Sequence, residues 1–165
     1  MIDFFHKGAS MTKKVTGVAK MKGAPVINPR DPIQITRVGT FIDGEDPVVS
    51  VLLEVADTPE KRMRGLMGRE QIPEIYGMLF EGLSGGGYFW MKNCLVPIDV
   101  AFIDNGGFVV KTYSMKVDKD GGEHYEYDDD SVAAVELQGG FLKKWGIVEG
   151  FMFDTRELSK EGANG

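Results

Sequence analysis

The stretch Gly87–Asp104, GYFWMKNCLVPIDVAFID, decides the fold, because it places two apolar runs of strand length on either side of a proline. Pro97 has no backbone N–H to donate to a strand partner, so it marks an edge, a bulge or a turn. We therefore expect strands over Tyr88–Met91 and Asp99–Ile103. The intervening segment Lys92–Ile98 should form the bend between them.

Polar side chains gather along this bend and define a candidate pocket, which is completed by an acidic residue on a strand that could neighbour it. The full candidate set is Arg69, Trp90, Lys92, Asn93, Asp99 and Glu136. A half-buried lysine beside an aspartate could transfer protons. The same groups could instead form a hydrogen-bonded network that fixes the turn. We favour the network, because buried polar groups at a bend are commonly satisfied in this way.

Three further segments accompany this stretch. They are TPEKRMRGLMGRE (Thr58–Glu70), GMLFEG (Gly77–Gly82) and AVELQGGFLKKWGIVEGF (Ala134–Phe151). Together with YFWMKNCLVPIDVAFID they resemble the domain-of-unknown-function family 192, also called uncharacterised protein family 0127, over about Val48 to Phe153. The resemblance implies a small, mostly β, barrel-like domain with one or two short helices. It implies no established activity.

Cys94 is the one cysteine in the chain, so an intrachain disulfide is impossible and nothing indicates an oxidising compartment. A nucleophilic thiolate would need a basic neighbour, and Lys92 lies two residues away. The resembling family usually has a hydroxyl residue at the position of Cys94. This departure argues against a nucleophilic thiol.

Alternating apolar residues and turn residues predict further strands on both sides of the central stretch. The expected strands are Ile33–Ile42, Val48–Ala56, Gly77–Phe80, Phe108–Met115, Val132–Gln138 and Ile147–Phe153. Asn105-Gly106-Gly107 predicts a tight hairpin, whereas the acidic segment Lys116–Ser131 predicts a loop. Short connections between many strands favour a mostly β (α+β) fold, built as a small barrel-like antiparallel β domain with one or two short helices.

Two segments predict the short helices. The first begins at Asp57-Thr58, where either side chain can cap it, and should bury Met63, Leu66 and Met67 on one face. The second is Phe141–Trp145, FLKKW, which a glycine follows directly.

The charge is divided unevenly along the chain, and it suggests three regions: a basic extended arm over 1–31, a single β-rich domain over 32–153 and a polar tail over 154–165. Residues 1–30 carry six basic and one acidic residue, so +5, whereas the other 135 carry 13 basic and 24 acidic residues, so −11. We predict that the arm contacts a partner, unless it is only a solvated leader. Its candidate contact residues are Lys13, Lys14, Lys20, Lys22 and Arg30.

The sequence predicts neither a metal site nor a cofactor. His6 and His124 are far apart, and the acidic residues of Asp118–Asp130 do not match the spacing of a calcium loop. No apolar run reaches the roughly 18 residues of a membrane span, and the N-terminus lacks the apolar block of a secretion signal. We expect a soluble chain made in the cytoplasm. Its acidic body should disfavour nucleic acid.

Two functions fit these observations. The first is a non-catalytic structural or interaction protein in a larger assembly, for example a component of a phage virion, whose arm orders on neighbouring subunits of the same or another protein. The second is a small-ligand-binding protein or an enzyme with a polar pocket around Lys92, Asn93 and Asp99. No catalytic set is evident in the sequence, so we favour the first.

Overall fold

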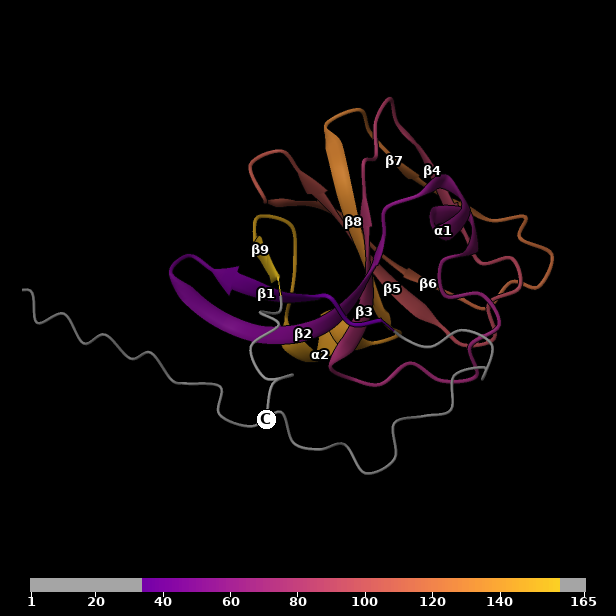
Figure 1. Cartoon of the computed structure of the whole chain (residues 1–165), viewed down its shortest axis with the longest axis horizontal. Coiled ribbons are helices and arrows are strands. Elements are labelled where there is room, and N and C mark those ends of the chain that lie inside the picture. Colours follow the sequence, from indigo (N-terminus) through magenta and orange to yellow (C-terminus); the bar gives the residue numbers. More distant parts are fainter. Residues whose placement is uncertain (1–33, 158–165) are drawn as a thin grey trace, which may run out of the picture.

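A computed structural model describes residues 34–157, which fold around a seven-stranded sheet in the strand order β6-β5-β8-β3-β2-β1-β9 and a two-stranded sheet, β4-β7 (Figure 1). The strands are β1 (Arg37–Asp43), β2 (Asp46–Ala56), β3 (Tyr76–Glu81), β4 (Gly87–Trp90), β5 (Ile98–Asp104), β6 (Val109–Met115), β7 (His124–Tyr127), β8 (Ser131–Gln138) and β9 (Met152–Glu157). The helices are α1 (Pro59–Arg64) and α2 (Phe141–Trp145). The predicted β-rich α+β fold is confirmed.

The large sheet is not a closed barrel. Its edge strands β6 and β9 are joined only at one end, by an isolated bridge between Phe108 and Met152. Three backbone hydrogen bonds of 2.8 Å lie beside the bridge, and one of them runs from the Val109 N–H to the Phe151 carbonyl. A barrel requires a continuous ladder between its last two strands, which β6 and β9 do not form.

One strand pair departs from the predicted antiparallel arrangement. β2 and β3 run parallel, with Leu52 beside Tyr76 and Ala56 beside Phe80. Parallel neighbours need a crossover connection rather than a tight turn, and the segment that contains α1 supplies it. The β1–β2 and β5–β6 pairs are antiparallel, and the second is the hairpin that Asn105-Gly106-Gly107 predicted.

The two strands of the central stretch do not pair with each other. β5 lies between β6 and β8 in the large sheet, whereas β4 pairs with β7. β7 falls within the segment that we expected to be a loop. Its ring contacts explain the pairing, because Tyr127 and Phe89 of the small sheet both pack against Phe102 of the large one, with centroids 5.1 Å from it in each case.

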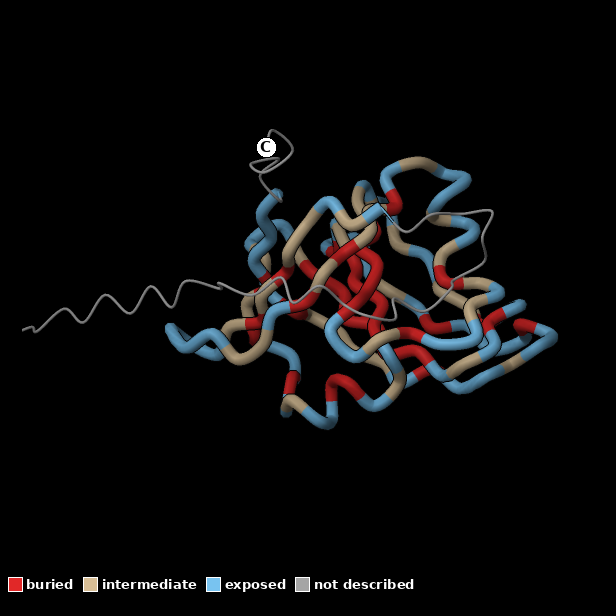
Figure 2. Tube along the Cα trace, turned by 60° about the horizontal axis from the view of Figure 1, so that its bottom comes forward, coloured by how far each residue is buried: buried red, intermediate tan, exposed pale blue. Residues whose placement is uncertain are grey.

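Each face of the large sheet carries its own hydrophobic core, and buried residues concentrate along the central strands (Figure 2). On one face, Phe141 and Leu142 of α2 pack with Val135 and Leu137 of β8. On the other face, Phe80, Phe102 and Ala134 pack beneath the small sheet. The alternation of β8 therefore divides its side chains between two different environments.

Helix α1 is shorter than the sequence indicates. The Thr58 hydroxyl accepts a hydrogen bond of 3.2 Å from the Lys61 N–H, so the predicted cap is confirmed. Gly65 ends the helix with a positive φ of 48°, and Met63 is 71% exposed rather than buried. Leu66 reaches the core from the turn after the helix. Helix α2 ends at Gly146, as predicted.

The last strand lies further along the chain than the expected Ile147–Phe153. Strand β9 runs to Glu157 and pairs with β1 along its whole length. Within residues 34–157, no helix has the length and apolar character needed to cross a membrane. The predicted arm, with Lys13, Lys14, Lys20, Lys22 and Arg30, lies outside the described residues, and so does the part of the predicted tail after Glu157.

Candidate ligand-binding cleft

A cleft of about 390 Å³ lies between α1, the turn that follows it and the small sheet. Glu136 of β8 and Cys94 belong to its lining, together with Phe80 at the end of β3. Apolar side chains surround these groups: Met63 and Leu66 come from the α1 side, and the aromatic residues of β4 from the other. The cleft therefore combines one buried carboxyl group with mostly apolar walls, which is the usual composition of a small-molecule site.

Gly65 makes room over the carboxyl group of Glu136. A Cβ at this position would lie 3.3 Å from Phe80 Cζ and 3.4 Å from Glu136 Oε2. The positive φ of Gly65 also disfavours any side chain there. Glycine at this turn thus ends α1 and keeps a side chain away from the carboxyl group of Glu136.

The carboxyl group of Glu136 is the distinctive polar group of the site. The residue is 5% exposed, and no described residue forms a hydrogen bond with its Oε2. Burial raises the pKa of Glu136 to about 8, although the charge of Arg69 and the backbone N–H of Leu66 both act to lower it. An empty cleft at pH 7 therefore holds this group mainly in its neutral form.

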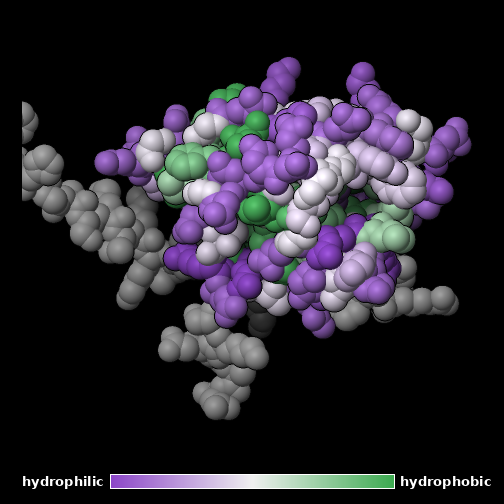
Figure 3. All heavy atoms as spheres, turned by 90° about the horizontal axis from the view of Figure 1, so that it is seen from above, coloured by the Kyte–Doolittle hydropathy of each residue, from purple (hydrophilic) through white to green (hydrophobic). Residues whose placement is uncertain are grey.

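Aromatic rings form one wall of the cleft. Phe89 contacts Phe80 edge to face, with centroids 4.9 Å apart, whereas Tyr88 stacks on His124 at 3.9 Å and meets Trp90 at 6.2 Å. Tyr88 is 51% exposed, so its ring also contacts solvent. Apolar side chains also reach the surface among hydrophilic ones on the face seen in Figure 3.

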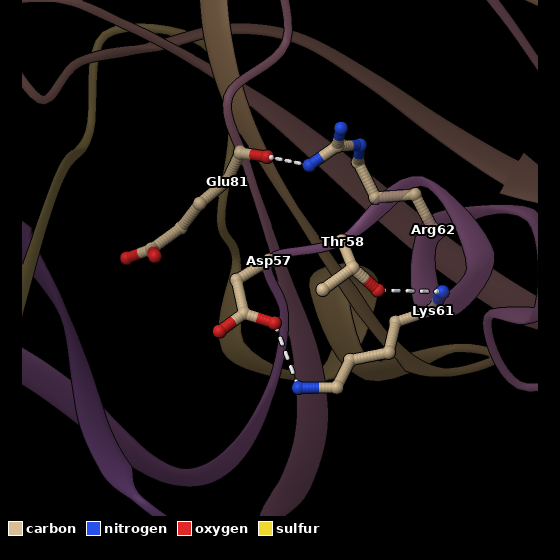
Figure 4. Close-up of polar contacts among 5 residues, drawn as sticks. All are labelled: Asp57, Thr58, Lys61, Arg62 and Glu81. Atoms are coloured by element: carbon tan, nitrogen blue, oxygen red, sulfur yellow. Dashed lines mark hydrogen bonds and ion pairs between the residues drawn. The ribbon is translucent and has the colours of Figure 1, made fainter.

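The opposite lip is the start of α1, where polar contacts hold the backbone and one arginine in place (Figure 4). Lys61 Nζ lies 2.7 Å from Asp57 Oδ1. Arg62 Nη1 donates to the Glu81 carbonyl at 2.9 Å, so the helix is tied to the end of β3. Arg62 and Arg64 both belong to the lining of the cleft.

Cys94 lies beside Glu136 but is not set up as a nucleophile. The residue is 5% exposed, and burial together with the nearby Glu136 carboxylate raises the pKa of its thiol to about 12. A thiol with such a pKa is almost fully protonated at pH 7. The side chain therefore contributes shape and polarisability to the cleft rather than a thiolate.

The six predicted pocket residues separate into three groups. Trp90 and Glu136 line the cleft. Arg69 is buried elsewhere: its Nη2 lies 2.5 Å from Glu54 Oε2, and its Nη1 donates to the hydroxyl of Tyr76. Burial raises the pKa of Tyr76 well above its usual value, although the Arg69 charge opposes this shift. Arg69 is thus part of an ion pair with Glu54 in which the side chains are only 11% and 12% exposed.

The other three predicted residues do not line the cleft. Lys92 is exposed, with its Nζ 5.2 Å from the centroid of the Trp90 ring. Asn93 has a φ of 60°, and its carbonyl accepts from Gly68 N–H, so it shapes the turn. Asp99 is buried on the α2 side, where Oδ2 accepts a 2.9 Å hydrogen bond from the Leu142 N–H. Asn93 and Asp99 therefore fit the structural interpretation of the bend.

Several cleft residues escaped the sequence analysis. The rings of Tyr88 and Phe89 are most simply predicted to lie in the core, because a sequence does not distinguish a buried ring from one that lines a cleft. Tyr127 lies in the segment that we expected to be a loop. Gly65 carried a usable signal, since a glycine in a helical pattern needs a reason. Its position next to Glu136 depends on the distance between α1 and β8, which is not visible in the sequence.

The chain matches the DUF192 family, described as "Uncharacterized ACR", over residues 40–154, which is more than half of its length. It therefore belongs to the domain-of-unknown-function family 192, as the four sequence segments indicated. A comparison with curated proteins finds no match.

Two solved structures share the fold. One is a protein from Sinorhizobium meliloti 1021 suggested to be a transcription regulator, with a TM-score of 0.69 and 25% identity, over 76% of this chain and 96% of that one. The other is a protein of unknown function from Novosphingobium aromaticivorans DSM 12444, with a TM-score of 0.68 and 25% identity, over 81% of this chain and 94% of that one. The present chain thus spans nearly the whole length of both.

Proposed function

We propose that this domain binds a small organic molecule in the cleft between α1 and the small sheet. The observation that carries the proposal is the Glu136 carboxyl group, which is 5% exposed and has an Oε2 that no described residue contacts through a hydrogen bond. A buried polar atom without a partner is costly, and this one belongs to a residue that lines a cleft. Here a ligand in the cleft would supply the missing partner.

The walls support the same proposal. An apolar lining with few polar groups is typical of sites that enclose most of a small ligand. Met63 and Tyr88 stand on opposite sides of the cleft, and both are more than half exposed, at 71% and 51%. A ligand between them would remove this apolar surface from water.

A fragment screen by ligand-observed NMR tests the proposal. We expect hits from flat organic fragments, and we expect Tyr88→Ala to weaken them by about tenfold because it removes one wall. Phe108→Ala is the matched control, since Phe108 is also a large exposed ring, at 43%, and does not line the cleft. Hits that survive Tyr88→Ala and disappear with Phe108→Ala would contradict the proposal, and so would a screen without hits.

The assembly function predicted from the arm is a second proposal, and the charge difference between the arm at +5 and the remaining chain at −11 supports it. In this proposal the arm binds neighbouring subunits in a particle such as a virion. Light scattering on the full chain and on a chain that starts at Asp31 tests it. A full chain that is larger than expected for a monomer, beside a monomeric shortened chain, would support it, and two monomers would contradict assembly through the arm.

A further inference from the structure

We propose that the ligand is an organic cation, a primary amine on a flat apolar group, whose ammonium group donates to Glu136 Oε2. This inference rests on the proposed function of the cleft and names its ligand class. The acceptor is in place: Glu136 is 5% exposed, and none of residues 34–157 satisfies Oε2. An ammonium group has three donors and no acceptor, so it matches a carboxylate oxygen without leaving an unpaired lone pair.

Among residues 34–157, no basic side chain forms a hydrogen bond with Glu136 Oε2. Arg69 is the basic group whose charge acts on Glu136, but its guanidinium group is engaged with Glu54 and Tyr76. Arg62 Nη1 donates to the carbonyl of Glu81 (Figure 4). Within the described residues the carboxyl group thus lacks a cationic partner, and a cationic ligand would supply one.

The aromatic wall favours the same ligand. The faces of Trp and Tyr rings attract cations, and the chain already uses this contact where Lys92 Nζ lies 5.2 Å from the Trp90 centroid. The rings of Trp90, Phe89 and Tyr127 line the cleft together with Glu136. They could contact both the ammonium group and the apolar part of the ligand.

The main competing ligand is an organic anion, because Arg62 and Arg64 lie on the lip. Arg64 is exposed and Arg62 is half-buried, so water screens both charges. Glu136 is almost fully buried, and a contact with it takes place where screening is weak. The contact with Glu136 should therefore contribute more to the binding free energy than the charges of Arg62 and Arg64. Cationic and anionic ligands can be compared directly.

Binding of an amine should release a proton, because an adjacent cation stabilises the ionised form of Glu136. The carboxyl group is mainly neutral in the empty cleft at pH 7, since burial raises its pKa to about 8. Affinity should thus increase as the pH rises towards 8 and then level off, until the amine itself loses its charge. The other titratable groups that line the cleft or act on Glu136 are Arg62, Arg64, Arg69, Tyr88, Cys94 and Tyr127.

Tryptophan fluorescence provides the test. The chain has two tryptophans, so a Trp145→Phe background leaves Trp90 in the cleft as the one reporter. Benzylamine, benzyl alcohol and benzoate share one ring and differ in charge. We expect benzylamine to bind about tenfold more tightly than benzyl alcohol, and benzoate to bind most weakly. Calorimetry of benzylamine binding in two buffers of different ionisation enthalpy should show proton release at pH 7.

Glu136→Gln tests the residue itself, with Glu149→Gln on the exposed surface as the matched control. The first variant should lose the preference for benzylamine and still bind benzyl alcohol, whereas the second should change neither. Circular dichroism checks that both variants fold. Benzyl alcohol or benzoate that binds as tightly as benzylamine, or benzylamine that releases no proton, would overturn the ligand class and leave the cleft proposal standing. If none of the three binds, both proposals fail.

Discussion

Two buried carboxyl groups lie on opposite faces of the same sheet, and they have different surroundings. Asp99 of β5 is 1% exposed and Glu136 of β8 is 5% exposed, and the two strands pair directly. Asp99 Oδ2 accepts from the Leu142 N–H at the start of α2, where the helix has no capping side chain of its own. Glu136 lines the cleft, and its Oε2 has no hydrogen-bond partner in the described part of the chain.

The difference shows that burial alone does not identify a site. Asp99 also has one oxygen, Oδ1, without a described partner, so an unsatisfied atom alone does not identify one either. What distinguishes Glu136 is that the residue also lines a cleft, whereas Asp99 does not. Asp99 therefore has a structural role, whereas Glu136 is the residue that we propose to contact a ligand.

The largest effect should come from Arg69, the buried cation whose charge acts on Glu136. Its ion pair with Glu54 has side chains only 11% and 12% exposed, so Arg69→Met leaves a buried carboxylate without a partner. We expect a loss of about 3–5 kcal/mol in the free energy of unfolding, measured by urea denaturation. The exposed Arg156→Met is the control, and an equal loss in both variants would contradict the burial argument.

Asp99→Ala should come next, because it leaves the buried Leu142 N–H without an acceptor. We expect a loss of about 1–3 kcal/mol in the same measurement, with no change in ligand affinity. The exposed Asp154→Ala serves as the comparison. If Asp99→Ala leaves the stability unchanged but abolishes ligand binding, the roles assigned to the two carboxyl groups are the wrong way round.

Glu136→Gln should change the pH dependence of stability. The pKa of Glu136 is raised from 4.5 to about 8 in the folded chain, so the folded state holds its proton more tightly than the unfolded state. This group therefore lowers the free energy of unfolding as the pH rises from about 4.5 to about 8, by up to roughly 1.4 kcal/mol per pH unit. The variant should remove this contribution. Identical pH profiles for the variant and the original chain would show that Glu136 titrates normally.

Lys92→Ala should have the smallest effect. The side chain is exposed, and its contact with the Trp90 ring is one that contributes about 0.5–1 kcal/mol at exposed sites. Thermal unfolding should shift little, and the affinity of the cleft for benzylamine should not change. A marked loss of affinity would show that Lys92 belongs to the binding site and that this site extends towards the bend.

Local patterns in the sequence were sufficient for much of the fold. Asn105-Gly106-Gly107 predicted the β5–β6 hairpin, in which Asp104 Oδ1 accepts from the N–H groups of Gly106 and Phe108. Alternation along β8 placed Val135 and Leu137 on the face opposite Ala134 and Glu136, as observed. These features depend on residues a few positions apart, so a single sequence contains them.

The candidate site was only partly predictable. Trp90 and Glu136 were selected from the sequence and line the cleft, whereas Lys92 and Asp99 were selected for their closeness to the bend. Because side chains alternate between the faces of a strand, residues near one bend can point to opposite sides of a sheet. Proximity in sequence was therefore a poor guide to a shared pocket.

The sequence by itself determined the family, most strand positions, the Thr58 cap and the helix before Gly146, because turn residues, caps and alternation act over short distances. Only the tertiary structure decided that β2 and β3 run parallel, that β4 pairs with β7, and that Glu136 rather than Asp99 faces a cleft. These outcomes depend on how distant aromatic side chains pack and on which space they leave open, and no local pattern encodes either.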